Sequence, residues 1–501
     1  MPLGSEPGRR RRNDRLVIAS LAALAILVTV GLLWSSSRLP ATYSVMGMGH
    51  AEFGGGPADE VHGGHTAHGW EGPPRQPGDR DVSELTGPRD RPADVAVELV
   101  AARDGDRYTL NGSTPGPQLR VEQGDLVEVT LVNESVPDGV TLHWHGVDVP
   151  NAEDGVAGVT QDAVAVGGTH TYRFVADDAG TYWYHSHQVS HAQVRGGLFG
   201  TLVVAPPTGE AADHDVVAAV HTYGDGPTVN GRRDGLRVDA APGESVRVRL
   251  VNTDNEVKRA WLADGVAFRL LAVDGHEVHE PGPVTAAVVL AAGGRADLGF
   301  EVPADGTAVR IELGGVTVVV APPDADVSPP DAQDAPADDV DLLHYGTPAP
   351  LGFDPGDPDR EFEYRIGRRF GLVDGRPGRH WTVNGRMFPD VPMFVVSDGD
   401  VVRMRIESSG ADNHPMHLHG HHAVVLSRDG EPATGSPWVV DSLDVGRDET
   451  YEIAFVAGNP GIWLDHCHDL VHARQGLVAH LAYTGVHTPF RIGGPGANEP
   501  E

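Results

Sequence analysis

Histidines at positions i and i+2 occur in four separate clusters of this sequence, and one such pair flanks the only cysteine of the chain. The four segments are His143-Trp144-His145, His185-Ser186-His187, His417-Leu418-His419 and His466-Cys467-His468. In a β-strand, residues i and i+2 point to the same face, so each pair presents two imidazoles to one place. In the last segment the thiolate faces away from both imidazoles. One tripeptide can therefore serve two metal sites and connect them covalently.

The side chains in these segments favour copper as the metal. A cysteine combined with imidazoles and few carboxylates suits copper, and a trigonal set of two histidines and one cysteine is typical of blue-copper sites. His414, Cys467 and His472 can supply that set. We therefore predict a sulfur-containing copper site that is joined through Cys467 to a histidine-rich copper cluster.

A threefold repeat indicates how the chain positions these residues. Residues 109–112, 228–231 and 382–385 each precede a Gly-Asp or Gly-Glu turn and an alternating strand, which reads LVEVTLVN, SVRVRLVN or VVRMRIES. Three such copies predict three related β-domains, built as sandwiches or barrels. The first and third copies carry all the histidine pairs, and the second copy has none. We therefore expect the metal cluster between the first and third domains, with the middle domain as a spacer.

The N-terminus has the features of a membrane anchor. Arg9–Arg12 and Arg15 precede an uncharged apolar run, Leu16–Trp34, that is long enough to span a bilayer as a helix. The arginines should stay in the cytoplasm, which leaves everything after Trp34 outside. A cleaved signal peptide is the alternative, although no clear small-x-small cleavage site follows the run. We expect a cell membrane-anchored protein whose catalytic part lies outside the cytoplasm, or a secreted protein if the segment is cleaved.

These patterns divide the chain into segments with different expected roles. Residues 41–91, rich in Gly, Pro, Asp and His, predict a flexible tether in which Met46, Met48 and several histidines could hold copper transiently. The predicted segments are residues 1–40 (cytoplasmic end and transmembrane anchor or signal), 41–91 (tether), 92–207 (first domain), 208–322 (second domain, without copper ligands), 323–359 (linker), 360–487 (third domain, with the sulfur-containing copper site) and 488–501 (disordered tail).

The charge balance limits the possible partners. Lys and Arg number 38 against 71 Asp and Glu, which gives a formal net charge of −33. Such acidity argues against nucleic acid as a partner and favours solubility, with some attraction for cationic substrates or metal ions. A single cysteine excludes an intramolecular disulfide.

The four histidine segments resemble the copper-binding signatures of the multicopper oxidase (laccase-like) family, and the resemblance covers roughly residues 92–487. It implies an all-β fold of three cupredoxin-like Greek-key β-barrel domains, preceded here by one transmembrane helix. It also implies four copper ions: a type 1 copper on His414, Cys467 and His472, a type 2 copper on His143 and His417, one type 3 copper on His145, His185 and His468, and the other on His187, His419 and His466.

The resemblance also implies roles for residues outside the ligand set. The family's weak axial ligand, where present, is a methionine ten residues after the cysteine, and Leu477 occupies that position here. The family carries an Asp-Gly after its first signature, matched by Asp154-Gly155, whose carboxylate is thought to feed protons to oxygen; an Asp-Gly turn is the alternative interpretation.

A second acid that some members carry three residues after the cysteine is absent, because Leu470 is there and Asp469 lies one residue earlier. We interpret the remaining histidines, including His421, His422 and His480, as structural or exposed.

We therefore predict an oxidase that takes single electrons from a small reducing substrate and passes them to dioxygen, which is reduced to water. Phenols and other aromatics are the favoured substrates. A cuprous or other metal-ion oxidase in copper tolerance is an alternative, but such relatives often carry a methionine-rich insert, and only 7 Met occur here. A copper nitrite reductase would share the sulfur-containing site without needing all four histidine pairs. A copper-sequestering protein could use the same ligands without catalysis.

Overall fold

The alternating segments of the repeat form the central strands of three β units. They are β7 (Leu126–Asn133), β15 (Ser245–Asn252) and β28 (Val401–Ser408). Each pairs in parallel with an earlier strand and antiparallel with a later one: β4–β7–β9, β12–β15–β21 and β24–β28–β34. Alternate side chains of β7 and β28 are buried, because one face of the strand lies against a second sheet, whereas the second half of β15 is buried on both faces. The predicted all-β architecture with a threefold repeat is confirmed.

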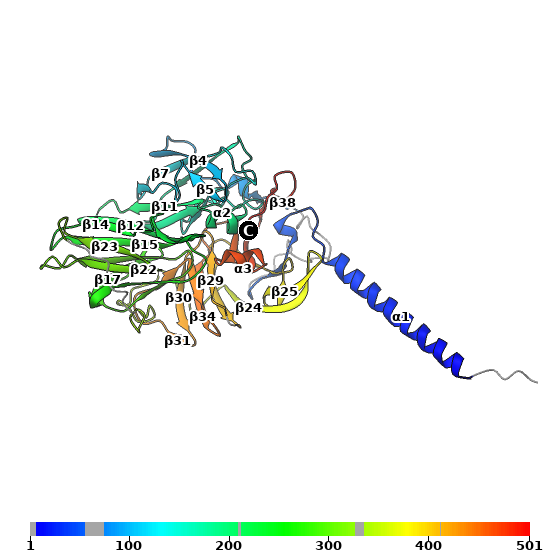
Figure 1. Ribbon diagram of the computed structural model, residues 1–501. Coiled ribbons are helices and arrows are strands. Elements are labelled where there is room, and N and C mark those ends of the chain that lie inside the picture. The colour runs from blue at the N-terminus through cyan, green and yellow to red at the C-terminus, as the bar shows by residue number, and fades with distance from the viewer. Residues whose placement is uncertain (1–6, 56–74, 209–211, 326–334, 411) are drawn as a thin grey trace, which may run out of the picture.

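The computed structural model describes residues 7–55, 75–208, 212–325, 335–410 and 412–501, and Figure 1 shows the units side by side. In the first unit, the sheet around β7 contains β5 (Arg107–Leu110), β4 (Val95–Asp104) and β9 (Thr169–Val175), and its partner sheet contains β6 (Leu119–Glu122), β11 (Phe199–Ala205), β10 (Gly180–His185) and β8 (His143–His145). Buried side chains from both sheets, among them Leu131 and Tyr182, form one hydrophobic core.

The second unit repeats this plan without histidine pairs. The sheet around β15 contains β13 (Gly226–Val229), β12 (His214–Tyr223), β21 (Arg295–Glu301), β17 (Phe268–Val273), β18 (His276–Glu277) and β19 (Pro283–Val284). Its partner sheet contains β14 (Leu236–Asp239), β23 (Val316–Ala321), β22 (Val309–Leu313), β16 (Lys258–Leu262) and β20 (Val288–Leu290). Strands β16 and β22 occupy the places where the first and third units carry their histidine pairs.

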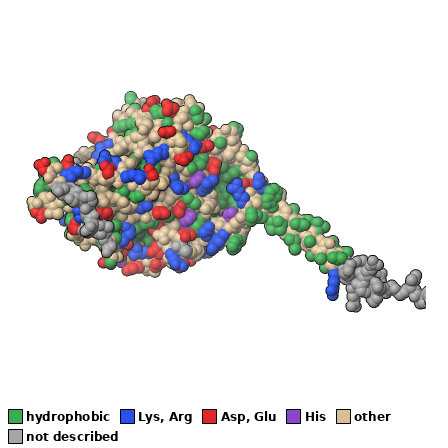
Figure 2. Space-filling model, in the orientation of Figure 1, with side chains coloured by type: hydrophobic (Ala, Val, Ile, Leu, Met, Phe, Trp, Pro, Cys, Tyr) green, Lys and Arg blue, Asp and Glu red, His purple; other side chains and the backbone are tan. Residues whose placement is uncertain are grey.

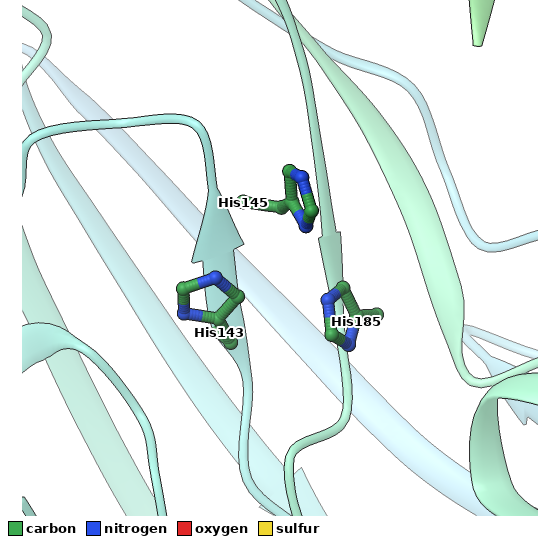
Figure 3. A group of neighbouring side chains, drawn as sticks. All are labelled: His143, His145 and His185. Carbon is green, nitrogen blue, oxygen red and sulfur yellow. The ribbon is translucent and has the colours of Figure 1, made fainter. Parts of the chain in front are cut away.

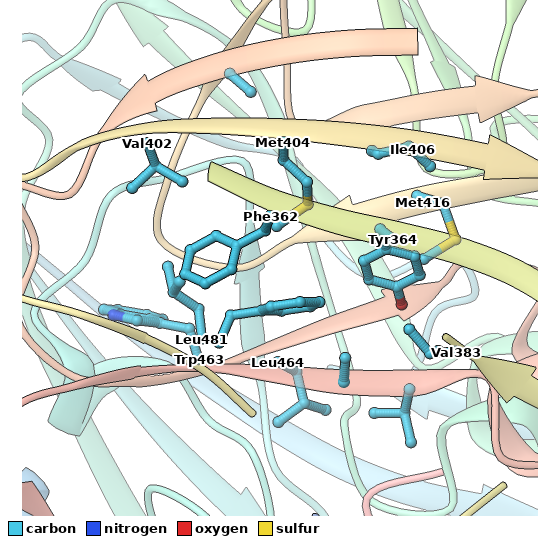
Figure 4. Close-up of a cluster of buried hydrophobic side chains, with 14 of the residues drawn as sticks. Phe362, Tyr364, Val383, Val402, Met404, Ile406, Met416, Trp463, Leu464 and Leu481 are labelled. Carbon is cyan, nitrogen blue, oxygen red and sulfur yellow. The ribbon is translucent and has the colours of Figure 1, made fainter. Parts of the chain in front are cut away.

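The third unit has the most strands, and one of them comes from the N-terminal side of the chain. One sheet contains β2 (His50–Glu52), β27 (Pro392–Val396), β36 (Val478–Tyr483), β35 (Ile462–Cys467), β29 (His414–Leu418) and β33 (Ser442–Val445). The other sheet contains β26 (Arg386–Met387), β25 (Arg376–Val383), β24 (Arg360–Val373), β28, β34 (Thr450–Val456), β30 (Ala423–Arg428), β31 (Glu431–Pro432) and β32 (Val439–Val440). Figure 4 shows the core between them, where Phe362 and Tyr364 meet Leu464 and Leu481.

The predicted flexible tether is wrong for its described parts. β1 (Thr42–Tyr43) pairs with β38 (Ile492–Gly493), β2 pairs with β27, and β3 (Arg80–Asp81) pairs with β37 (Val486–His487). Met46 and Met48 are buried in the third unit, so they are core residues and not transient copper ligands. Burial of such apolar side chains, at about 1.5–3 kcal/mol each, explains why the segment is ordered despite its composition. His62, His65 and His68 lie outside the described residues.

The predicted disordered tail is also wrong. Residues 488–501 continue along the first unit, where the amide of Val189 donates to the carbonyl oxygen of Glu499 at 2.6 Å and the amide of Glu499 donates to Gln188 at 2.9 Å. Asn498 and Glu501 are buried. Specific hydrogen bonds hold this tail where its Gly- and Pro-rich composition suggested disorder.

Helix α1 (Pro7–Ser36) projects away from the β units, and its last turn lies beside the tip of the β24–β25 hairpin (Figure 1). Residues Asp14–Ser36 are long and apolar enough to cross a membrane, and none of the most apolar part is buried in the protein. The short helices α2 (Ser190–Arg195) and α3 (Leu470–Arg474) each follow a histidine-bearing segment. The single-turn helices are η1 (Val45–Gly47), η3 (Val82–Glu84), η4 (Asn151–Glu153) and η5 (Ala263–Gly265).

Candidate metal centre

Two pairs of neighbouring strands position the four His-x-His segments. β8 and β10 are antiparallel in the first unit, with His143 opposite His185. β29 and β35 are antiparallel in the third unit, with His417 opposite His466. The eight histidines of the pairs are all buried. Neighbouring strands thus bring together imidazoles that are far apart in the sequence.

The imidazoles of the two units meet in one cluster. The Nε2 atoms of His143 and His417 are 3.3 Å apart, and those of His419 and His466 are 3.1 Å apart. Figure 3 shows the rings of His143 and His145 on β8 close to the ring of His185. Three histidine groups have potential ligand atoms within 4.8 Å of one another: His143, His145 and His185; His143, His417 and His419; His187, His419 and His466.

His468 belongs to none of these groups but lies beside the first of them. Its ring centre is 4.9 Å from that of His145 and 5.4 Å from that of His185. The expectation that the cluster lies between the first and third units therefore agrees with the geometry.

Hydrogen bonds on the outer side of the cluster leave one nitrogen of most rings facing inward. The Nδ1 atoms of His185, His417 and His466 lie 3.0, 2.8 and 3.2 Å from backbone carbonyl oxygens, to which an N–H there donates. His145 is reversed: its Nε2 lies 2.9 Å from Ser442 Oγ, and its Nδ1 remains without a partner. Such outer bonds fix the tautomer and the orientation of histidines that bind metals.

Several inward nitrogens are buried with no hydrogen-bond partner among the described residues. They are His145 Nδ1, His185 Nε2, His187 Nε2 and both nitrogens of His468. Burial lowers the pKa of His185 to about 3, with a further contribution from His143, so this imidazole is neutral. Because buried polar atoms are normally paired, neutral imidazoles with free lone pairs fit a set of metal ions such as copper.

Two carboxylates hold these rings from outside the cluster. The carboxylate of Asp154 lies 3.0 Å from Nδ1 of His143 and 3.1 Å from Nδ1 of His419, so it connects the two units. The chain turns at Gly155, where φ is +75° and a Cβ atom would lie 1.8 Å from the carbonyl oxygen of Leu142. The Asp-Gly turn and the contact with the histidines are therefore both present.

Asp441 is the second carboxylate, and the sequence motifs did not predict it. Its Oδ1 lies 3.1 Å from Nε2 of His145 and 3.6 Å from Nδ1 of His417. Arg295 of the second unit donates to both oxygens of Asp441, at 2.6 and 2.5 Å, and is fully buried. The Arg295 guanidinium helps to hold the pKa of Asp441 well below its usual range, although burial opposes this. The middle unit is therefore more than a spacer, because it positions a carboxylate at the cluster.

The predicted sulfur-containing site is assembled around Cys467, the last residue of β35, directly after His466 of the histidine cluster. Cys467 Sγ is 4.0 Å from Nδ1 of His414 and 3.8 Å from Nδ1 of His472. The ring of Trp381 packs against both of these histidines, with ring centres 4.7 and 4.5 Å apart. Burial raises the pKa of the Cys467 thiol well above its usual value, and such a thiol loses its proton on binding a metal ion.

Leu477 and Asp469 flank the sulfur-containing site. Leu477 is fully buried, and its carbonyl oxygen accepts a hydrogen bond from the amide of Cys467 at 3.2 Å. The carboxylate of Asp469 accepts a bond from the amide of Val471 at 3.0 Å, which caps α3, and lies 3.4 Å from Nε2 of His472. Asp469 is therefore at the sulfur-containing site and not at the histidine cluster.

Three further histidines of the third unit, His421, His422 and His480, are buried outside the ligand groups. His421 Nε2 lies 2.6 Å from the hydroxyl of Tyr483, and His422 Nδ1 lies 3.2 Å from Asp148. Asp148 and Asp441 raise the pKa of His422 to about 10 against the opposing effect of burial. His480 is buried on β36. These positions agree with structural roles.

Glu501 is the other nearby residue that the motifs missed. Its carboxylate lies 3.3 Å from Nδ1 of His466 and accepts a bond from Ser190 Oγ at 2.8 Å. Burial raises its pKa to about 8. No spacing pattern in the sequence marks this residue, and its place follows from the ordered tail.

Known proteins share this sequence pattern and fold. The multicopper oxidase family profiles match residues 95–209 and 365–485. Laccase-1 of Botryotinia fuckeliana is 27% identical over 463 residues, covering 76% of this chain and 80% of that protein. Multicopper oxidase MmcO of Mycobacterium tuberculosis is 26% identical over 469 residues, covering 81% and 87%.

A solved multi-copper oxidase from Pseudomonas thermotolerans has a TM-score of 0.64 and 29% identity, covering 78% of this chain and 100% of that one. This likeness confirms the predicted cupredoxin-like fold class. The two profile matches contain the strands that carry all four histidine pairs. The chain therefore belongs to the multicopper oxidase family, whose members are copper oxidoreductases with dioxygen as the electron acceptor.

Proposed function

We propose that the protein is a laccase-like oxidase that couples one-electron oxidation of phenols and other aromatics to reduction of dioxygen to water. The position of Cys467 carries this proposal. Its sulfur faces His414 and His472, while its sequence neighbours His466 and His468 lie in the histidine cluster. An electron that enters at the sulfur-containing site can therefore reach the cluster through one strand.

We assign four copper ions to these groups. The type 1 ion takes His414, Cys467 and His472, and the type 2 ion takes His143 and His417, whose Nε2 atoms face each other. One type 3 ion takes His145, His185 and His468, and the other takes His187, His419 and His466. The free inward nitrogens and the fixed outer nitrogens of these rings support the assignment.

When bound, copper would supply one-electron transfer and dioxygen reduction, in which four electrons and four protons convert one O₂ into two H₂O. The chain connects the two sites through Cys467 and its peptide neighbours. Asp154 contacts Nδ1 of both His143 and His419, so it holds these two rings in place at the interface between the first and third units. Its carboxylate is also placed to pass protons to the cluster. Asp441, which Arg295 holds in place, contacts Nε2 of His145 and orients that ring.

The positions of the methionines favour organic substrates over cuprous ions. Three of the four methionines of the third unit, Met393, Met404 and Met416, are buried in hydrophobic cores, and Met387 alone is partly exposed. Soft thioether ligands are what a site for cuprous ions would need.

The proposal includes a place outside the cytoplasm, anchored by α1. The exposed apolar surface of Asp14–Ser36 suits a bilayer, and the arginines that precede it would stay on the cytoplasmic side.

Replacing the only cysteine tests the proposed function. Cys467→Ser should abolish the intense blue absorption and all substrate oxidation, because only a thiolate gives that charge-transfer band. Most of the cluster copper should remain, since its histidine ligands are unchanged. Absorption spectra, copper content and oxygen uptake measure these effects. A fully blue variant would refute the assignment of Cys467.

Oxygen uptake by the unmodified protein separates the alternatives. Kinetics with a phenol, Cu(I), Fe(II) and Mn(II), measured side by side, should favour the phenol. A preference for Cu(I) would instead indicate a metal-ion oxidase. Tightly bound copper without oxygen uptake from any reductant would indicate a copper-sequestering protein.

A further inference from the structure

A cavity of about 870 Å³ lies between α2, α3, the β24–β25 hairpin and the ordered segments near both ends of the chain. Its lining is unusually basic for a protein with a net charge of −33. Figure 2 shows blue and purple side chains on this face, over α2, α3 and β25. The arginines that line the cavity are Arg195, Arg368, Arg376, Arg379 and Arg474. The local charge is thus opposite to the net charge.

Most of this positive charge is not neutralised by the surrounding protein. Arg195, Arg376 and Arg379 form no ion pair with a carboxylate in the part of the chain that the structure describes. Arg474 donates to a histidine, Nε2 of His191, at 2.8 Å. Arg368 is 3.8 Å from the exposed carboxylate of Asp412.

Three acids, Asp374, Glu499 and Glu501, also line the cavity, against five arginines. Asp374 is already 3.6 Å from Arg38. Glu501 makes its hydrogen bond to Ser190, away from the arginines. Unpaired guanidinium groups around a cavity stabilise an anion inside it, and they bind carboxylates and sulfonates through paired N–H donors.

The cavity adjoins the sulfur-containing site. Val471 and Ala473, on either side of His472, line it. The guanidinium of Arg368 lies 4.3 Å from the ring centre of Trp381, which packs on His472. The side chain of His472 is 16% exposed, whereas His414 and Cys467 are almost completely buried. An electron donor in the cavity therefore lies next to the most accessible ligand of that site.

We propose that this cavity binds aromatic reductants that carry a carboxylate or sulfonate group. The proposal rests on the proposed function and narrows its substrate class. The arginines bind the anionic group, and Tyr43, Val45, Phe388 and Val471 provide an apolar lining for the ring. Each phenol loses one electron to the sulfur-containing site and one proton to water, which leaves a phenoxyl radical. Four such oxidations supply the electrons that, with four protons, reduce one O₂ to two H₂O.

A matched substrate pair tests this proposal on the copper-loaded full-length enzyme. Hydroquinone and hydroquinone sulfonate differ by one anionic group, and the ratio of their kcat/KM values is compared between variants, which cancels their different intrinsic reactivity. Arg376→Gln/Arg379→Gln should lower the sulfonate-to-neutral ratio about tenfold, as expected for loss of two partly solvated ion pairs. Arg237→Gln/Arg269→Gln, two exposed arginines of the middle unit, removes the same charge far from the cavity and should not change the ratio.

Binding of the redox-inert naphthalene-2-sulfonate, measured by calorimetry, gives a second readout. It should bind the unmodified enzyme and bind about tenfold more weakly to the cavity variant. An unchanged ratio in the cavity variant, or an equal fall in the middle-unit variant, would overturn the proposal. Failure of the unmodified enzyme to oxidise any phenol would instead overturn the proposed function.

Discussion

Asp154 touches the outer nitrogens of two histidines from different units, His143 and His419, at 3.0 and 3.1 Å. The same carboxylate can therefore orient ligands and carry protons towards the cluster. Its neighbour Glu153 is equally buried but hydrogen-bonds to the amide of Arg173, which is not a ligand. The two adjacent acids differ in what they contact, and this makes them a matched pair for experiment.

Asp154→Asn should keep four coppers and slow oxygen reduction by the reduced enzyme, by about 10²–10⁴-fold if the carboxylate delivers protons. The rate difference between Asp154→Asn and the unmodified enzyme should grow at high pH, because the solvent then supplies few protons to replace those that Asp154 delivers. Glu153→Gln is the control and should leave this step unchanged. Single-turnover reoxidation of the reduced enzyme, followed across pH, measures both. An unchanged rate in Asp154→Asn would leave Asp154 as a turn residue only.

Leu477 is fully buried in the same hydrophobic core as Cys467, and its carbonyl oxygen accepts a hydrogen bond from the amide of Cys467. A thioether at the axial position favours the oxidised copper, and leucine cannot donate electrons. Leu477→Met should therefore lower the type 1 potential and slow oxidation of poorly reducing phenols. Packing alone predicts a stability change under about 1.5 kcal/mol and little change in potential. Redox titration of the blue band decides, and an equal or higher potential would contradict the axial role.

At the scale of elements, strand pairing decides which residues could be predicted from sequence. The four histidine pairs and Cys467 follow a fixed spacing on repeated strands, so the sequence pattern alone is enough to mark them. Asp441 and Arg295 have no such spacing. Their roles arise only when the second unit packs against the third, which no local pattern encodes. The ordered tail and the N-terminal strands were missed for the same reason, because their partners are distant in sequence.

Removing Arg295 tests the contribution of the second unit. Arg295 contacts both Asp441 and Asp274 with no exposed surface, so Arg295→Met leaves two buried carboxylates without their guanidinium partner. We expect a loss of about 3–5 kcal/mol in the free energy of unfolding and less copper bound near His145. Arg310→Met, which removes a partly exposed pair with Asp264, should cost at most about 1 kcal/mol. Chemical unfolding and copper analysis measure both. Equal losses in the two variants would mean that Arg295 has no special role.

At the scale of the whole molecule, the segment after α1 connects that helix to the third unit. Arg38 lies 3.6 Å from Asp374 at the tip of the β24–β25 hairpin, and the amide of Gly375 donates to Ser37 at 3.1 Å. Tyr43, Val45 and Met48 are then buried in the third unit and also line the basic cavity. The C-terminal end of α1, the cavity and the sulfur-containing site are therefore close together, and this proximity was not visible in a sequence that predicted a flexible tether.

Two shortened proteins separate anchoring from folding. The full-length protein should fractionate with membranes and remain there after a high-salt wash, because the apolar helix is held by burial in lipid and not by charge. A protein that begins at Ala41 lacks the helix but keeps β1 and β2, so it should be soluble and active. A protein that begins at Asp79 also loses the buried segment around Met46 and Met48, so it should unfold at a lower denaturant concentration and lose oxidase activity.

Expression of the full-length sequence could contradict the anchoring role of the helix. Protein found free in solution and beginning after Trp34 would show that the helix is a cleaved signal. Equal stability of the two shortened proteins would show that the segment from Thr42 to Phe53 is dispensable for the fold, contrary to its burial in the third unit.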